Sequence, residues 1–281
     1  MPRRVAVTGA AGQLGRQLVR TFAEAGDEVL QVVRPEWDIE RADDLTRLAA
    51  WAPDVVINAA AWTDVDGCAR DPERALRING EAAGAVAAAA ARAGALSVQI
   101  STNEVFDGLR ETPYAEDDPT DPRNPYGASK LRGEELTRAA NPRSIVVRTA
   151  WLFGPGGTNF VTKILAAADR ARVAGEPLRV VDDEWGNPTW TPFLADDVRA
   201  LVDVGAGGIY HLGGEPATSR LGWARTFLGE TMPIESISMR DFQRASRVPP
   251  RAVLSTAKAQ ALGLPPRGWA APSLAVAGER G

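Results

Sequence analysis

The sequence predicts an α/β protein: a doubly wound parallel sheet covered by helices, with a smaller lobe formed by the C-terminal part. Three observations lead to this prediction. Short apolar segments alternate with helical patterns through the first half, which is typical of strand–helix–strand units. A glycine-rich turn separates the first apolar segment from the first helical one. Beyond Gly186 prolines become frequent and the alternation is lost, which indicates loops.

The expected elements follow in chain order. Strands are expected at the short apolar segments, residues 5–7, 28–33, 54–58, 96–101, 144–148, 178–181 and 208–212. Helices are expected at residues 13–25, 42–50, 72–94, 126–140 and 159–174. Gly26 ends the first helix, and Pro125 suits the start of the fourth. The Pro-rich stretch 112–125 is expected to be a long loop, and such loops are often functional.

The composition argues against several classes of partner. The 281 residues include 32 basic and 36 acidic side chains, a formal net charge of -4, without a block of Lys or Arg. Nucleic acid is therefore a poor candidate partner. The longest apolar stretch, residues 82–91, is much shorter than the roughly 20 residues of a membrane span. No apolar signal segment follows the start Met-Pro-Arg-Arg, so a cytoplasmic location is expected.

Residues that bind metals are scarce. Cys68 is the single cysteine, which rules out an internal disulfide and argues against a cysteine-based zinc site. His211 is the single histidine, and it is expected to be a packed or solvated side chain in a strand. No metal site is therefore expected.

The first turn indicates a dinucleotide site. Gly9, Gly12 and Gly15 are spaced Gly-x-x-Gly-x-x-Gly between a strand and a helix. In such a turn the first glycine allows the tight bend, the second lets a pyrophosphate approach, and the third allows close helix–sheet packing. An ordinary tight turn is the alternative. At the start of an alternating strand–helix pattern, the motif predicts a Rossmann-like NAD(P)-binding domain.

The residue after the second strand bears on the choice of coenzyme. NAD enzymes place a carboxylate there for the ribose hydroxyl. This strand ends in Arg34, which suits the 2′-phosphate of NADP or is simply solvated. NADPH is therefore preferred, with NADH still open. The third strand ends in the small residues Ala59, Ala60 and Ala61, which leave room for a cofactor or for close helix packing.

A tyrosine and a lysine four residues apart suggest carbonyl chemistry. Tyr126 and Lys130 fall on one face of the fourth helix. An ammonium group near a phenol lowers the phenol's pKa, so that Tyr126 could donate a proton to a carbonyl oxygen while hydride reaches the carbon. Thr102 ends the fourth strand, where its hydroxyl could bind the same oxygen. Tyr-x-x-x-Lys alone is usually a surface pair, but its position after a glycine-rich turn favours catalysis.

Seven segments resemble a known family. They are residues 8–15 (TGAAGQLG), 53–66 (PDVVINAAAWTDVD), 78–82 (INGEA), 101–108 (STNEVFDG), 126–134 (YGASKLRGE), 148–154 (RTAWLFG) and 182–189 (DDEWGNPT). Through them nearly the whole chain resembles the extended short-chain dehydrogenase/reductase superfamily and, within it, the dTDP-4-dehydrorhamnose reductase family. The second and sixth segments are more specific than the glycine turn.

The resemblance implies an NADPH-dependent reductase of a nucleotide-linked 4-keto-6-deoxy sugar, which would, for example, reduce dTDP-4-dehydrorhamnose to dTDP-L-rhamnose. Tyr126 would donate the proton, Thr102 would stabilise the oxyanion, Lys130 would bind the nicotinamide ribose and tune Tyr126, and Trp151 would pack on the sugar. The implied cofactor contacts are Gly12, Gln13, Leu14, Asp38, Ile39, Ala61, Trp62 and Thr63. Arg247 and Arg251 would hold the substrate diphosphate or be solvated. Pairing of two copies as a homodimer, as in some relatives, stays open.

The expected domains follow from this assignment. Residues 1–150, with about 190–212 returning to them, would form the NAD(P)-binding Rossmann domain. Residues 151–189 and 213–281 would form the smaller substrate-binding lobe.

The chain departs from the family at one place. Asn103 and Glu104 stand where the family usually has Asp and Tyr, so the amide of Asn103 could bind a sugar hydroxyl but not act as a base. The segment Thr-Asn-Glu-Val also resembles the Thr-Asp-Glu-Val of nucleotide-sugar 4,6-dehydratases, whose acid Asn103 replaces. Dehydratase or 4-epimerase chemistry is therefore the second enzymatic hypothesis. A non-catalytic NADP-binding regulatory subunit is the hypothesis from another class, and the Thr102, Tyr126 and Lys130 set argues against it.

Overall fold

The computed structural model describes residues 2–278, and a six-stranded parallel sheet forms its centre. The strands are β1 (Arg4–Thr8), β2 (Glu28–Val32), β3 (Val55–Asn58), β4 (Leu96–Thr102), β5 (Ser144–Thr149) and β10 (Gly208–His211). Their order is β10-β5-β4-β3-β1-β2, and every neighbouring pair is parallel. The winding reverses between β1 and β3, which makes the sheet doubly wound. Such a reversal opens a crevice for ligands at the carboxyl ends of the strands.

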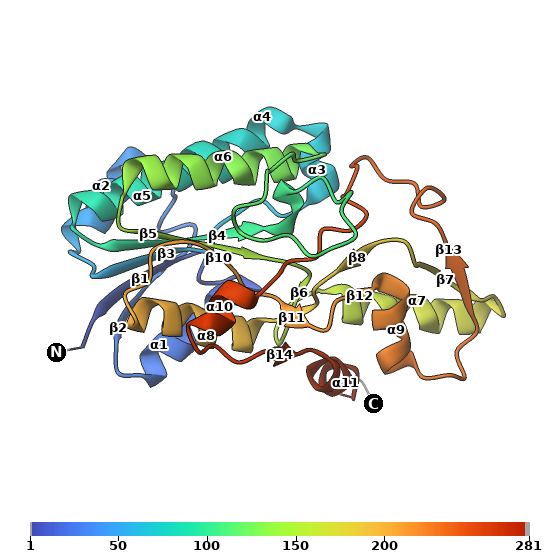
Figure 1. Ribbon diagram of the computed structural model, residues 1–281. Coiled ribbons are helices and arrows are strands. Elements are labelled where there is room, and N and C mark those ends of the chain that lie inside the picture. The colour runs from blue at the N-terminus through green and yellow to red at the C-terminus, as the bar shows by residue number, and fades with distance from the viewer. Residues whose placement is uncertain (1, 279–281) are drawn as a thin grey trace.

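Helices cover both faces of this sheet, so the predicted fold class is confirmed (Figure 1). One face carries α1 (Gln13–Glu24) and α8 (Thr191–Asp203), which contact each other. The other carries α2 (Ala42–Ala50), α5 (Ala82–Arg92) and α6 (Pro125–Ala140). Side chains alternate along β1 accordingly: Val5 and Val7 join the core on the first face, and Ala6 joins the core on the second.

The helix expected over residues 72–94 is not continuous. It is divided into α4 (Pro72–Ala75), a π-helical turn η1 (Leu76–Glu81) and α5, and it is preceded by the short helix α3 (Val65–Arg70). The π-turn contains Asn79, whose buried side chain bonds to the backbone of Trp62. An insertion of this kind in a helix is frequent near functional sites.

The C-terminal part is more regular than the prolines suggested. A helix, α8, starts at Thr191 because Pro192 stands in its first turn, where a missing N–H is tolerated. The helices α7 (Phe160–Ala174), α9 (Arg220–Leu228) and α11 (Ala270–Gly278) pack together beside the parallel pair β7 (Leu178–Val181) and β13 (Ile234–Ile237). The remaining elements are the helix α10 (Ala257–Ala261), the 3-10 turn η2 (Asn103–Val105) and the two-residue strands β6 (Leu152–Phe153), β8 (Trp185–Gly186), β9 (Thr189–Trp190), β11 (Gly214–Glu215), β12 (Thr218–Ser219) and β14 (Arg267–Gly268).

Two cores lie in this C-terminal part. One joins α7 and α9 to the β7–β13 pair, and the other is aromatic, with Phe153, Trp223 and Trp269 as its buried rings. Among the described residues, no helix combines the length and apolarity that crossing a membrane requires. The exact division into two domains stays a prediction.

Candidate active site

The residues proposed from sequence for the cofactor, the carbonyl oxygen and the sugar lie near the carboxyl ends of the sheet strands. They follow five strands in turn and are Gly9, Gly12, Gln13, Leu14 and Gly15 after β1; Arg34, Asp38 and Ile39 after β2; Ala59, Ala61, Trp62 and Thr63 after β3; Thr102 and Asn103 at the end of β4; and Trp151 after β5, with Tyr126 and Lys130 on α6. The carboxyl ends of parallel strands share one edge, so the topology places these residues along one crevice. Of the two arginines considered for the diphosphate, Arg251 bonds instead to the backbone oxygen of Glu111 at 3.0 Å.

The glycine turn has the close contacts that the motif requires. Gly9 has a positive φ of 63°, and a Cβ there would lie 2.8 Å from the backbone of Ala60. A side chain at Gly15 would collide with the carbonyl oxygen of Gly9. At Gly12, the N-cap of α1, a Cβ would meet only that same oxygen, at 3.1 Å. Gly12 thus leaves its own place at the helix N-terminus open, while the side chains of Gln13 and Arg16 bond to the backbone of Gly154 and Gly156. A pyrophosphate can bind at such an open helix N-terminus.

The residues after β2 form a charged cluster. Arg34 donates hydrogen bonds to Asp38 at 2.9 Å and to Glu40 at 2.8 Å. Its side chain is 58 % exposed, so it can also be reached by a ligand. Ile39 is buried beside it in the second core. The cluster holds both groups that discriminate between coenzymes, a guanidinium and a carboxylate.

The segment after β3 is fixed by the π-turn. Asn79 accepts a hydrogen bond from the N–H of Trp62 at 2.8 Å and donates to its carbonyl oxygen at 3.0 Å. The same amide donates to Ser129 of α6 at 3.1 Å. One buried side chain therefore connects the predicted cofactor segment to the helix that carries Tyr126 and Lys130. Thr63, next in the chain, is exposed.

The three predicted catalytic side chains meet where β4 ends and α6 begins. The hydroxyl of Thr102 lies close enough to the Tyr126 phenol to lower the pKa of the phenol. Lys130 lies one helical turn beyond Tyr126 and is buried, and its amino group donates to the carbonyl oxygen of Ile100 at 2.5 Å. Gly127 is needed between them, because any side chain there would collide with the backbone oxygen of Glu104.

The pKa values of this group are shifted by burial. Burial lowers the pKa of Lys130 to about 8, with Glu134 acting in the opposite direction. Burial also raises the pKa of Tyr126, the charge of Glu104 raises it further, and the hydrogen bond with Thr102 lowers it. The expectation that Lys130 lowers the phenol's pKa is therefore wrong for this structure, in which the amino group donates to Ile100 instead. Shifted pKa values gathered in one place are typical of active sites.

The Asn103 side chain, expected to bind a sugar hydroxyl, instead bonds to the protein backbone. Its side chain is buried, and its amide donates to the backbone oxygen of Ala252 at 2.9 Å. It thereby holds the C-terminal segment against the end of β4.

Glu104 and Arg220 were missed by sequence reasoning. The carboxylate of Glu104 accepts a hydrogen bond from Asn124 at 2.6 Å, its backbone oxygen packs on Gly127, and its charge raises the pKa of Tyr126. Arg220 lies 3.6 Å above the ring of Trp151 and pairs with Glu184 at 2.8 Å. The sequence pointed to Glu104 only through its place two residues after Thr102 and through the dehydratase-like segment Thr-Asn-Glu-Val, neither of which gave it a role in the reduction. Nothing in the sequence pointed to Arg220.

Trp151 follows β5 and packs against residues of the C-terminal part. Its φ of 47° is positive, which is uncommon for a residue other than glycine and is frequent at functional sites. Its ring stacks on Trp223 with 5.9 Å between ring centroids. Stacking and the cation above it fix a flat aromatic surface.

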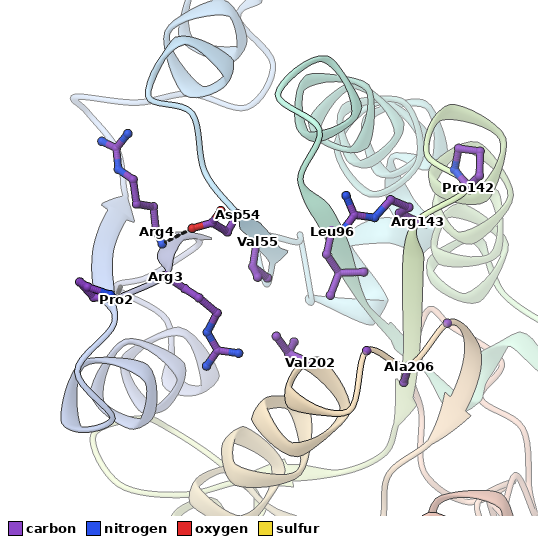
Figure 2. Close-up of a pocket in the computed structure, with 12 residues that line it drawn as sticks. Pro2, Arg3, Arg4, Asp54, Val55, Leu96, Pro142, Arg143, Val202 and Ala206 are labelled. Carbon is purple, nitrogen blue, oxygen red and sulfur yellow. Dashed lines mark hydrogen bonds between the residues drawn. The ribbon is translucent and has the colours of Figure 1, made fainter.

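A hollow of about 780 Å³ lies elsewhere, at the amino ends of the strands (Figure 2). Arg3, Arg4, Asp54, Leu96 and Arg143 are among the residues that line it. None of the predicted site residues does, so this hollow is separate from the crevice described above.

Comparison with known proteins agrees with this geometry. The family model described as the RmlD substrate binding domain matches residues 3–276. A dTDP-4-dehydrorhamnose reductase of Burkholderia thailandensis is 41% identical over 231 residues, which are 79% of this chain and 76% of that protein. This chain belongs to the dTDP-4-dehydrorhamnose reductase family.

Two further relatives cover the chain more completely. The spore coat polysaccharide biosynthesis protein SpsK of Bacillus subtilis is 37% identical over 270 residues, 95% of this chain and 94% of that protein. The crystal structure of a dTDP-4-dehydrorhamnose reductase from Bacillus anthracis, in complex with NADP, superposes with a TM-score of 0.91 at 28% identity and covers 100% of both chains. The family assignment made from the seven sequence segments is thus confirmed over the whole chain.

Proposed function

We propose that this protein is an NADPH-dependent reductase of a nucleotide-linked 4-keto-6-deoxy sugar, with dTDP-4-dehydrorhamnose as the first substrate to try. The observation that carries the proposal is the group at the end of β4. The Thr102 hydroxyl lies close enough to the Tyr126 phenol to act on its pKa, and Lys130 is buried one turn further along α6. Two hydroxyl groups side by side are suited to bind one carbonyl oxygen. The membership of a reductase family supports the same reading.

The crevice fits a dinucleotide cofactor. Gly12 and the N-terminus of α1 would receive the pyrophosphate, because Gly12 has no side chain to block its approach. Arg34 would pair with a 2′-phosphate, and Asp38 would compete for the same guanidinium or bind a ribose hydroxyl. When bound, the reduced nicotinamide supplies the hydride. The NADP complex of the Bacillus anthracis relative supports NADPH as the first cofactor to test, and NADH remains a second.

The chain's own residues would supply the proton and the orientation. Tyr126 would protonate the oxygen at C4, and Thr102 would stabilise the negative charge that develops on it. Lys130 would bind the ribose hydroxyls beside Tyr126. Trp151 would pack against the sugar, with its ring held by Trp223 and Arg220. The raised pKa of Tyr126 keeps the phenol protonated at neutral pH, as a proton donor requires.

The other hypotheses lack a specific observation in their favour. A dehydratase needs an acid at position 103, and the Asn103 side chain here is occupied by the backbone of Ala252. A purely regulatory protein has no need for a Thr102 hydroxyl next to the Tyr126 phenol and a buried Lys130. The expected cytoplasmic location and homodimer stay predictions, which cell fractionation and size-exclusion chromatography would test.

Replacement of Tyr126 by Phe tests the proposal. We expect NADPH oxidation with dTDP-4-dehydro-β-L-rhamnose to slow by about 10²-fold or more, the usual scale for loss of a general acid. Cofactor binding, followed by NADPH fluorescence, should be retained. The control is Tyr210→Phe, which removes the hydroxyl of a buried tyrosine in β10. Near-normal turnover in Y126F, with NMR showing the reduced sugar, would contradict the assigned role.

A further inference from the structure

Glu104 is the ionisable group of the crevice that the proposed reduction leaves without a role. It lies in η2, two residues after Thr102, and its backbone N–H donates to the Thr102 hydroxyl at 3.2 Å. Its backbone oxygen packs so closely on Gly127 that no side chain fits there. The residue is thus held between the oxyanion-binding threonine and the first turn of α6, the turn that contains Tyr126.

The carboxyl group is held by the side chain that caps this helix. Asn124 accepts a hydrogen bond from the N–H of Gly127 at 2.8 Å and so caps the N-terminus of α6. Its amide group donates to the Glu104 carboxylate at 2.6 Å and to the backbone oxygen of Arg247 at 3.0 Å. A single neutral side chain therefore fixes the Glu104 carboxyl group relative to Tyr126, two residues further along the helix.

In the described part of the chain, the charged groups around Glu104 do not form an ion pair with its carboxylate. The titratable and charged groups that act on it or feel its charge come from other parts of the crevice and are Cys68, Tyr126, Glu184, Arg220 and Arg244. Both arginines are engaged elsewhere, Arg220 with Glu184 at 2.8 Å and Arg244 with Asp66 at 3.3 Å. Burial, aided by Glu184 and opposed by Asn124 and the two arginines, raises the pKa of Glu104 to about 7.

We propose that Glu104 is a positioning residue that controls proton donation by Tyr126: the neutral carboxyl group permits it and the ionised carboxylate slows it. The inference rests on the proposed reduction. When Tyr126 gives its proton to the carbonyl oxygen, a negative charge forms on the phenol. A carboxylate held nearby in a desolvated crevice opposes that charge, whereas a neutral carboxyl group does not. The chain would therefore reduce its substrate faster on the acidic side of neutrality.

The pH dependence of kcat in the full chain tests this control. With NADPH and dTDP-4-dehydro-β-L-rhamnose at saturation, kcat of the unaltered protein should fall about three- to fourfold between about pH 5.5 and about pH 7.5, since the neutral fraction of a group with a pKa of about 7 falls by about that factor over this range. Glu104→Gln keeps an oxygen for Asn124 but cannot ionise, so its kcat should be flat over that range. A fall near pH 8 from Lys130 should remain in both proteins.

A second variant should shift the fall of kcat to another pH instead of removing it. Asn124→Ser retains a helix-capping hydroxyl but is too short to reach the Glu104 carboxylate. Loss of that hydrogen bond should raise the pKa of Glu104 further, so the fall in kcat should shift to higher pH. This variant keeps the inference testable if Glu104→Gln does not fold.

The outcomes separate the two proposals. The unaltered protein could turn over while kcat of Glu104→Gln falls between about pH 5.5 and about pH 7.5 as much as kcat of the unaltered protein does. This result would overturn the role of Glu104 and leave the reductase assignment intact. Inactivity of Glu104→Gln at every pH, with normal NADPH binding, would also overturn it, because the carboxyl group would then be needed for itself. Absence of turnover with every 4-keto sugar nucleotide, in the unaltered protein, would remove the reductase assignment and the inference with it.

Discussion

Ionisable side chains lie at both ends of the parallel strands, the amino edge and the carboxyl edge of the sheet, but their partners differ. At the amino edge Arg3 pairs with Asp27 at 2.9 Å and with Asp203 at 2.6 Å, and Figure 2 shows Arg3 and Arg4 beside the hollow there. At the carboxyl edge Lys130 donates to a backbone oxygen and Glu104 accepts from an amide, and both have pKa values shifted toward neutrality.

The difference shows how charge is used in this fold. An arginine paired at the surface stays charged at every physiological pH and contributes a little stability. A lysine or glutamate buried beside neutral partners destabilises the fold, but its pKa moves into the pH range in which it can exchange protons during a reaction. The carboxyl edge is therefore the reactive one, although the amino edge has the well-defined hollow.

Breaking the buried ion pair between Glu134 and Arg148 should have the largest effect on stability. Glu134 of α6 pairs with Arg148 of β5 at 2.8 Å and accepts a hydrogen bond from Ser101, and both charged side chains are 3 % exposed. Glu134→Gln leaves the Arg148 charge buried without a counter-ion, so we expect a loss of about 3–5 kcal/mol in the free energy of unfolding. Urea denaturation measures it.

The same helix offers the control. Glu135 pairs with Arg132 at 2.9 Å on the surface, and Glu135→Gln should change stability by about 0.5 kcal/mol or less. If both variants had equal effects, the contrast between buried and exposed pairs in this molecule would not hold.

The parts of this site that the sequence predicted are those defined by local spacing. Gly9, Gly12 and Gly15 lie within one turn, and Tyr126 and Lys130 lie one helical turn apart, so neighbouring residues alone indicate their chemistry. The order of strands and helices was predictable for a similar reason, because each short apolar segment fits one buried parallel strand.

The parts that were missed depend on contacts between distant segments. Glu104 acquires its role from Asn124, twenty residues further on, and Arg220 from Trp151 and Glu184. Helix α8 was not expected because prolines indicate loops, yet Pro192 stands in a first turn, where it is favourable. The raised pKa of Tyr126 likewise follows from burial, which the spacing of Tyr and Lys does not reveal.

Removal of the buried lysine should separate function from stability. Lys130→Met keeps the apolar stem and deletes the buried amino group, and the Ile100 oxygen keeps its bond from Gln99 at 2.8 Å. We expect reduction to be lost and the free energy of unfolding at neutral pH to rise by about 1–2 kcal/mol. Lys163→Met, at an exposed position of α7, is the control and should change neither.

The sign of the pH dependence sharpens this test. Because the pKa of Lys130 falls from 10.5 to about 8 on folding, the folded protein holds its proton less tightly than the unfolded chain. The destabilisation of the folded protein by the buried charged amine is therefore complete below pH 8 and disappears as the pH rises toward 10.5. The stability advantage of Lys130→Met should shrink over the same range, and an advantage that stays constant would contradict burial of a charged amine as its cause.

The smallest effect is expected at the amino edge. Asp203→Asn removes one partner of Arg3, but Asp27 remains, and the Arg3 and Asp203 side chains are 30% and 42% exposed. Water and salt screen such a pair, so the loss should be about 0.5 kcal/mol at low salt and should vanish at about 1 M salt. Urea denaturation at the two salt concentrations measures it, and turnover should be unaffected because the crevice lies at the other end of the strands. A salt-independent loss of several times this size, or a fall in turnover, would show that the amino edge supports the site and that the two edges are not separate in function.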